Sequence, residues 1–187
     1  MRHSKALIEF IQKNNIKILA EVGIERGRLL RTILRSPCKD VIDEYWAIDP
    51  WKPLGMKYGE AIGRRTRRNW FDIFMRVSEY MVWFKQLRVL RMNSVDAANN
   101  IFPDKYFDLV YIDADHSTLA VLDDINAWIP KIKDSGYLAG HDYNIGGVQK
   151  AVNQLLSPVD DMMYHSRSWL KKISDIKKDN PEMINEE

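Results

Sequence analysis

Short apolar runs alternate along this chain with segments of helical periodicity, and this alternation constrains the fold more than any other feature. The apolar runs predict strands buried on both faces, as in a parallel sheet; they lie at 16–24, 44–51, 87–93, 106–113 and 136–143. The segments GRLLRTILR, TLAVLDDINAWIPKI and GVQKAVNQLL have the spacing of amphipathic helices. Strands that alternate with helices predict crossover units and a mostly parallel sheet, which is an α/β fold.

Two further short segments, 161–165 and 168–174, predict a closing hairpin that adds an antiparallel strand at one edge of the sheet. In sheets of this kind, ligands bind beyond the carboxyl ends of the strands. Five residues with the character of a binding site stand at predicted strand ends: Gly23, Asp49, Asp113, His141 and Asp142. We therefore expect these residues, which are far apart in sequence, to line one crevice.

Composition limits what kind of protein this is. A chain of 187 residues with 45% hydrophobic residues suits one globular domain, which we place at 1–175 with a flexible tail at 176–187. The single cysteine excludes a disulfide or a cysteine-cluster metal site within the chain. No apolar run approaches the roughly 20 residues of a membrane span, and a net charge of +2 gives no polyanion-binding signal. We expect a cytoplasmic protein with no membrane or nucleic-acid partner.

The segment 52–86 interrupts the alternation of strands and helices. It begins with Gly and Pro and continues with the run RRTRR, for which we predict a solvated helix start. Apolar residues then recur at helical spacing: Trp70, Phe74, Val77, Met81 and Phe84. One interpretation is an ordinary crossover helix packed on the sheet. The other is an insertion that forms a lid over the crevice or a homodimer contact.

The first predicted strand leads into a turn that suits a nucleoside cofactor. Glu21, Gly23 and Gly27 lie at this strand-to-helix turn, where glycine permits positive φ and close approach of a ligand to the backbone. Asp49 ends the next strand, about 20 residues further on, where an acid can accept hydrogen bonds from both ribose hydroxyls. Because the third glycine of a dinucleotide fingerprint is missing, a pyrophosphate is disfavoured.

These motifs resemble those of the class I S-adenosylmethionine-dependent methyltransferases over about 16–173. The resemblance implies a Rossmann-like fold, with a mostly parallel seven-stranded sheet, helices on both faces and an antiparallel edge hairpin. It also implies S-adenosylmethionine as cofactor. The positions that match cofactor-binding residues of the family are Glu21, Gly23, Gly27, Asp49, Asn93, Ser94, Val95 and Asp113.

The segments FDLVYIDADHST and GYLAGHDY resemble the branch that contains catechol-type and antibiotic-sugar O-methyltransferases. In that branch an acid after the fourth strand and two polar ligands after the fifth hold a divalent ion. Here the resemblance implies a Mg²⁺ or Mn²⁺ site of Asp113, His141 and Asp142, with Asp115 as general base. Many relatives carry Asp-Asp or Asp-Asn where this chain has His-Asp. His141 is therefore either a ligand that shifts the preference toward manganese, iron or zinc, or no ligand and instead a general base or hydrogen-bond donor.

We therefore predict transfer of a methyl group from S-adenosylmethionine to an oxygen of a small hydroxylated acceptor, with or without a metal ion. Nitrogen as the accepting atom stays open. The rival hypotheses are a non-catalytic module that binds cofactor or a partner, and a nicotinamide-dependent oxidoreductase. We predict that His116 and Ser117 cap the helix after the fourth strand. Asp123 and Asp124, within that helix, are predicted to be solvated.

Overall fold

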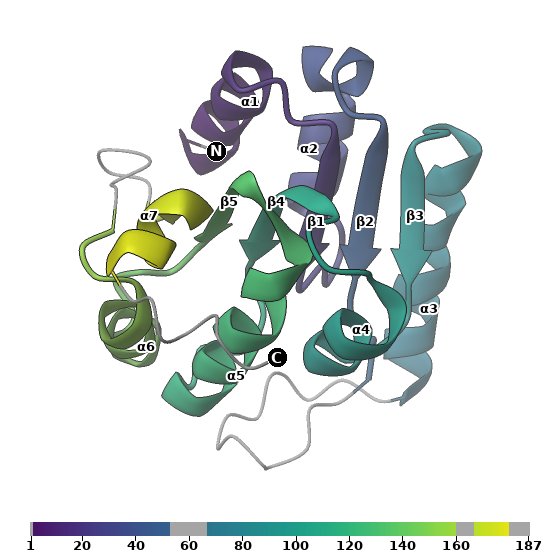
Figure 1. Cartoon of the computed structure of the whole chain (residues 1–187). Coiled ribbons are helices and arrows are strands. Elements are labelled where there is room, and N and C mark those ends of the chain that lie inside the picture. Colours follow the sequence, from purple (N-terminus) through teal and green to yellow (C-terminus); the bar gives the residue numbers. More distant parts are fainter. Residues whose placement is uncertain (1, 53–66, 160–166, 180–187) are drawn as a thin grey trace.

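The computed structural model describes residues 2–52, 67–159 and 167–179 (Figure 1). Its strands are β1 (Ile18–Val22), β2 (Glu44–Ile48), β3 (Leu87–Leu90), β4 (Phe107–Ile112), β5 (Ile132–Gly140) and β6 (Trp169–Lys172). Its α-helices are α1 (Arg2–Lys13), α2 (Arg28–Leu34), α3 (Arg67–Ser78), α4 (Ser94–Ile101), α5 (Thr118–Trp128), α6 (Gly146–Leu156) and α7 (Ile173–Asp179). Short 3₁₀ helices are η1 (Pro37–Asp40), η3 (Glu79–Val82) and η4 (Ile129–Lys131).

The sheet has the order β3-β2-β1-β4-β5-β6, in which the first five strands are parallel and β6 is antiparallel to β5. This confirms the predicted α/β fold with an antiparallel strand at one edge. The sheet of the described residues has six strands rather than the predicted seven. The additional strand was predicted at 161–165, which lies outside the described residues. Strand order reverses between β1 and β4, where an open α/β sheet forms a crevice.

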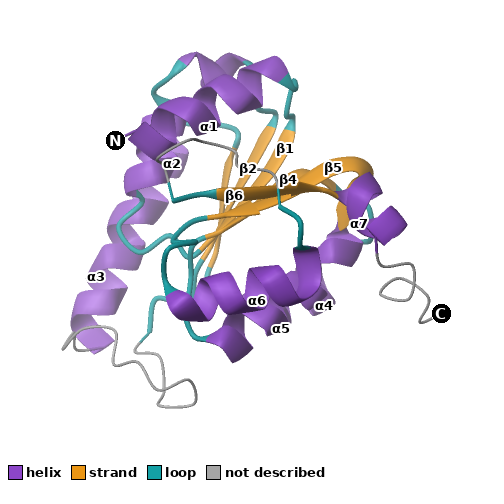
Figure 2. Ribbon diagram, turned by 90° about the vertical axis from the view of Figure 1, so that its left-hand side faces the viewer, coloured by secondary structure: helices purple, strands orange, loops and turns teal. Residues whose placement is uncertain are grey.

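Helices cover both faces of the sheet (Figure 2). Helices α1, α2 and α3 bury their apolar residues on one face, and α4, α5 and α6 bury theirs on the other. Successive strand residues point to opposite faces, so Leu19 enters the first core and Ala20 the second. Because both faces are covered, the central strands are mostly apolar, which explains the hydrophobic runs in the sequence.

Gly23 allows the turn after β1 to lie directly against the chain that leaves β4. It has φ of 90°, and a Cβ there would stand 2.1 Å from the main-chain oxygen of Asp113. The main-chain N–H of Gly23 donates to Ile48, and that of Asp113 donates to Val22. The glycine is therefore needed for close packing of two chain segments, and this packing places Asp113 beside the turn.

Helix α3 buries part of its apolar stripe in the core on one face of the sheet. Trp70 and Val77 are buried, and the ring of Phe74 lies 5.2 Å from that of Trp51. Met81 is exposed, because the α-helix ends at Ser78 and continues as a 3₁₀ helix with a different periodicity, whereas Phe84 still packs against the core. A lid or homodimer role for 52–86 stays a prediction, and 53–66 lie outside the described residues.

The C-terminal helix α7 continues to Asp179, past the boundary at 175 suggested by the sequence. Two of its residues, Ile173 and Ile176, are buried in the core on the α4–α6 face, which explains why helical structure extends this far. None of the helices in the described ranges is long and apolar enough to cross a membrane.

Candidate active site

The carboxyl ends of β1, β4 and β5 place three of the predicted segments side by side. In the sheet register Val22 is opposite Ile112, and Ile112 is opposite Gly140. The next residues along the chain are Gly23, Asp113 and His141, so they follow neighbouring strand ends. The main-chain N–H of His141 donates to Ile112 at 3.0 Å and extends the ladder by one residue.

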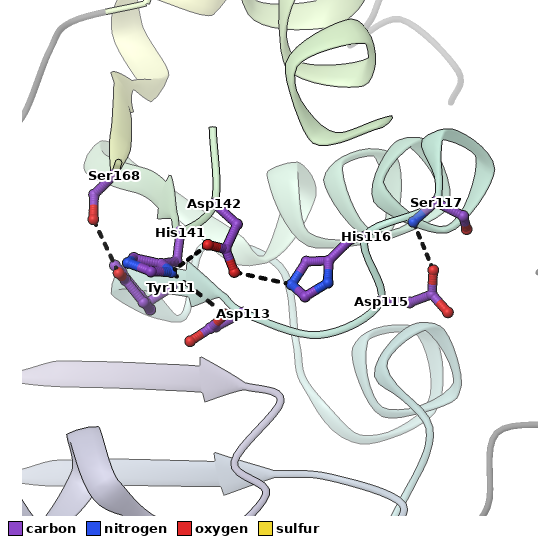
Figure 3. A network of polar contacts seen from close by, with 8 residues as sticks. All are labelled: Tyr111, Asp113, Asp115, His116, Ser117, His141, Asp142 and Ser168. Carbon is purple, nitrogen blue, oxygen red and sulfur yellow. Dashed lines mark hydrogen bonds and ion pairs between the residues drawn. The ribbon is translucent and has the colours of Figure 1, made fainter. Parts of the chain in front are cut away.

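Asp113, His141 and Asp142 form a compact cluster (Figure 3). Each offers one ligand atom, and these atoms all lie within 4.8 Å of one another. His141 Nδ1 lies 3.1 Å from Asp142 Oδ1 and 4.0 Å from Asp113 Oδ1. Asp142 has φ of 54°, which is uncommon for a residue other than glycine. Such strained conformations concentrate at functional sites, so this one agrees with a binding role for the cluster.

The electrostatics of Asp113 indicate a crowded acidic crevice. Burial raises its pKa from 3.8 to about 6. The nearby charges of His141 and His116 lower this pKa, whereas those of Asp142 and Glu25 raise it. The negative charge of Asp113 is therefore unfavourable in this crevice, and a positively charged ligand bound beside it would stabilise that charge.

His116 was predicted to cap a helix, but the structure brings it to the cluster. Its Nε2 lies 3.1 Å from Asp142 Oδ2, so Asp142 stands between two imidazole rings (Figure 3). One signal in the sequence indicated that His116 belongs to the site, namely its position directly after a strand end with two acids. That signal was insufficient, because the partner residue lies in the loop after a different strand.

Asp115 faces away from the cluster, toward the start of α5 (Figure 3). It is 8% exposed, and its Oδ1 accepts a hydrogen bond of 2.7 Å from the main-chain N–H of Ser117. An extended chain would turn Asp113 and Asp115 to the same side, but β4 ends at Ile112. Asp115 still lines the same small pocket as Asp113 and His141. Its role as general base stays a prediction.

In the cofactor half of the crevice, the carboxylate of Asp49 holds the glycine turn. Oδ2 accepts hydrogen bonds from the main-chain N–H groups of Ile24 and Glu25, at 3.0 and 2.9 Å. Oδ1 accepts one from Trp51 at 2.6 Å. The carboxylate therefore fixes the turn after β1 to the end of β2. A carboxylate has about four acceptor positions, so one is left for a ribose hydroxyl.

Three of the predicted cofactor-binding residues stand at the start of α4. Asn93 precedes the helix, Val95 packs against the core, and the Ser94 hydroxyl accepts a hydrogen bond from Trp128 at 2.8 Å. Ser94 also bonds Asp124, which is buried, so the prediction of a solvated Asp124 is wrong. Burial raises the pKa of Asp124 to about 7. The reason is that α5 packs against α4, which a helical pattern alone does not show.

Glu21 lies in the core, on the face covered by α1, α2 and α3. It is 2% exposed and accepts a hydrogen bond from the Tyr45 hydroxyl. Burial raises its pKa from 4.5 to about 8, although the bond from Tyr45 lowers it. Burial therefore favours the protonated form of Glu21, and its bond with Tyr45 joins β1 to β2 inside the core.

Replacing Glu21 by Gln is expected to remove a pH dependence of stability. Between about pH 4.5 and pH 8 the folded protein holds a proton on Glu21 that the unfolded chain releases. The free energy of unfolding therefore falls as pH rises, by up to about 1.4 kcal/mol per pH unit. Urea unfolding of the metal-free protein measures this between about pH 5 and pH 8. The free energy of unfolding of the variant should rise relative to that of the wild type as pH rises.

Glu44→Gln is the matched control for this measurement. Glu44 also accepts a hydrogen bond from a tyrosine, Tyr106, but it is less buried, so the hydrogen bond outweighs burial and the pKa of Glu44 is lowered. Its ionised form stabilises the fold above the unfolded pKa, so the control variant should lose stability relative to the wild type at neutral pH. Equal pH slopes for the wild type and Glu21→Gln would show that Glu21 is ionised in the folded state.

A comparison with protein families matches residues 20–143 to a family described as a methyltransferase domain. The match covers well over half of the chain. The chain belongs to this methyltransferase family. A comparison of this chain with curated proteins found no match.

Solved structures show the same fold. The O-methyltransferase NovP is 18% identical with a TM-score of 0.62, over 91% of this chain and 77% of NovP. A structure named as a caffeoyl-CoA O-methyltransferase from Staphylococcus aureus is 15% identical with a TM-score of 0.61, over 90% and 80%. The N-methyltransferase NodS from Bradyrhizobium japonicum WM9 is 12% identical with a TM-score of 0.56, over 90% and 91%. These findings confirm the resemblance to class I methyltransferases that the sequence motifs indicated.

Proposed function

We propose that this domain transfers a methyl group from S-adenosylmethionine to an oxygen of a small hydroxylated acceptor, assisted by a divalent metal ion. The observation that carries the proposal is the cluster of Asp113, His141 and Asp142, which lies at neighbouring strand ends beside the glycine turn. In open α/β sheets this is where a ligand binds.

The charge of the crevice supports the cofactor. S-adenosylmethionine carries a positive sulfonium, and the crevice is rich in carboxylates. Glu25 and Asp142 both lie close enough to raise the pKa of Asp113. A cation in this place would relieve their mutual repulsion. The methyl group must also be aligned between sulfur and acceptor oxygen, which is a task of positioning that a rigid turn at the end of β1 can serve.

The donor set supports the metal ion. Two carboxylates and one imidazole, with ligand atoms within 4.8 Å of one another, fit a divalent cation. The imidazole shifts the preference from Mg²⁺ toward Mn²⁺, iron or zinc, and the two carboxylates keep Mn²⁺ a suitable ion. When bound, such an ion lowers the pKa of an acceptor hydroxyl. The choice of oxygen as acceptor atom depends on this cluster, because the fold alone also occurs in an N-methyltransferase.

The proton of the acceptor needs a base. If Asp113, His141 and Asp142 hold the ion, the Nδ1 atom of His141, which faces the two carboxylates, binds the ion and cannot accept a proton. Asp115 is then the remaining carboxylate in the pocket. To act as base, it must turn from the Ser117 N–H toward the acceptor. We propose this role for Asp115, with His141 as the competing base if no metal binds.

S-adenosylhomocysteine is expected to bind the wild-type protein with a Kd that is roughly micromolar, about 8 kcal/mol. Asp49→Ala should weaken binding by about 2 to 3 kcal/mol, because it removes a carboxylate that can accept from a ribose hydroxyl and releases the glycine turn. Isothermal titration calorimetry measures both values. Asp43→Ala is the control, since Asp43 is exposed at the opposite end of β2.

A different calorimetric result would overturn this assignment. Tight NADH binding without any response to S-adenosylhomocysteine would favour the oxidoreductase hypothesis. Binding of S-adenosylhomocysteine with no methyl transfer to any hydroxylated acceptor, in the presence of Mn²⁺, would favour the non-catalytic module. Equal losses for Asp49→Ala and Asp43→Ala would show that Asp49 does not contribute to the cofactor site.

A further inference from the structure

We propose that His116 is a positioning residue for the metal site: it holds the carboxylate of Asp142 in the orientation that binds the ion. This inference rests on the proposed metal site and adds a residue that the sequence motifs do not assign. It starts from the arrangement of Asp142 between His116 and His141 (Figure 3).

The two oxygens of Asp142 have different neighbours. Oδ1 lies 3.1 Å from His141 Nδ1, on the side of Asp113. Oδ2 lies 3.1 Å from His116 Nε2, on the opposite side. Oδ1 therefore faces the candidate ligand atoms, whereas Oδ2 faces a nitrogen outside that set. One oxygen can bind an ion while the other stays in contact with His116.

The backbone holds His116 in place. Helix α6 begins directly against it: a Cβ on Gly147 would stand 2.3 Å from the main-chain oxygen of His116. On the other side, Asp115 accepts a hydrogen bond from the main-chain N–H of Ser117. The loop after β4 is thus pinned on both sides of the imidazole. These contacts use main-chain atoms or neighbouring residues, so a change of the His116 side chain leaves them intact.

Asp142 needs such support because its own backbone does not fix the carboxylate. It stands in a turn at φ of 54°, where its main-chain oxygen accepts a hydrogen bond from Ile145 at 2.8 Å. Its side chain is 19% exposed and can rotate unless a partner holds it. Ligating carboxylates are commonly held by a hydrogen-bonding partner, whose loss costs about 10- to 100-fold in metal affinity.

The test is a titration of the purified full chain with MnCl₂, followed by the electron paramagnetic resonance signal of free Mn²⁺. His116→Ala should weaken Mn²⁺ binding by about 10- to 100-fold. His116→Gln places an amide N–H near the position of Nε2 and should restore most of the affinity. Binding of S-adenosylhomocysteine and the melting temperature of the metal-free variants should match the wild type. If the Ala variant melts earlier, His116→Leu, which keeps the bulk, takes its place.

The outcomes separate the two proposals. If Asp113→Asn loses Mn²⁺ but His116→Ala binds it as tightly as the wild type, the metal site stands and the positioning role is wrong. If His116→Gln is as weak as His116→Ala, the imidazole is needed for more than its N–H, which also overturns a positioning role. If the wild type binds no Mn²⁺, the metal site itself fails and this inference fails with it.

Discussion

Replacing Asp113 by Asn is expected to lower both Mn²⁺ affinity and methyl transfer by at least about 100-fold, since the loss of a ligand should exceed the 10- to 100-fold effect of losing an outer partner. Asn keeps the size of the side chain but removes the charge that attracts the cation. Excess Mn²⁺ should restore part of the activity, because the variant weakens binding and leaves the other ligands in place.

The measurement combines Mn²⁺ titration with transfer of a labelled methyl group to an acceptor that the wild-type protein methylates. Asp104→Asn is the control, because Asp104 is an exposed acid whose partner, Lys131, is not part of the cluster. It should change neither quantity. Full activity of the wild type in the presence of a chelator would contradict the metal role. Asp113 would then act only next to the cofactor.

Replacing Asp115 by Asn is expected to lower kcat by about 10²- to 10⁴-fold, the usual contribution of a general base. Mn²⁺ and S-adenosylhomocysteine should bind almost as tightly as in the wild type. The fold should be preserved, because the Asn side-chain oxygen can still accept the hydrogen bond from the Ser117 N–H. The pH profile of kcat should lose the limb that reports deprotonation of the base.

His141→Ala decides between the two candidate bases. In the proposed arrangement His141 is a ligand, so its loss should weaken Mn²⁺ binding, and added Mn²⁺ should recover part of the rate. Suppose instead that His141→Ala abolishes turnover at saturating Mn²⁺ while Asp115→Asn leaves kcat unchanged. His141 would then be the base, and Asp115 would serve only to begin α5.

Much of the fold could be predicted from the sequence. The apolar runs indicated the strands, and their alternation with helices indicated a mostly parallel sheet, because residue type reports burial directly. The strand ends were also predictable, so Gly23, Asp113 and His141 could be expected at the same edge. The 3₁₀ ending of α3 was not predictable, because a change of helix type leaves the hydrophobic spacing almost unaltered.

The directions in which the side chains of the site point could not be predicted from the sequence. Asp115 and His116 are adjacent residues with equally plausible chemistry, and the turn after Ile112 decides which of them reaches Asp142. The alternation rule ends with the strand, and no periodicity replaces it in a loop. Asp49 shows the same limit, since the sequence predicted a ribose ligand and the structure adds three main-chain N–H groups around it.

The sequence by itself determined the family, the order of strands and helices along the chain, and the strand ends that carry acids and histidines. It could do so because these features depend on local patterns and on motifs with characteristic spacing. Only the tertiary structure decided that Glu21 and Asp124 are buried acids with raised pKa values, and that His116 lies beside Asp142. The reason is that burial and side-chain contacts depend on which elements pack together, and these partners are distant in sequence.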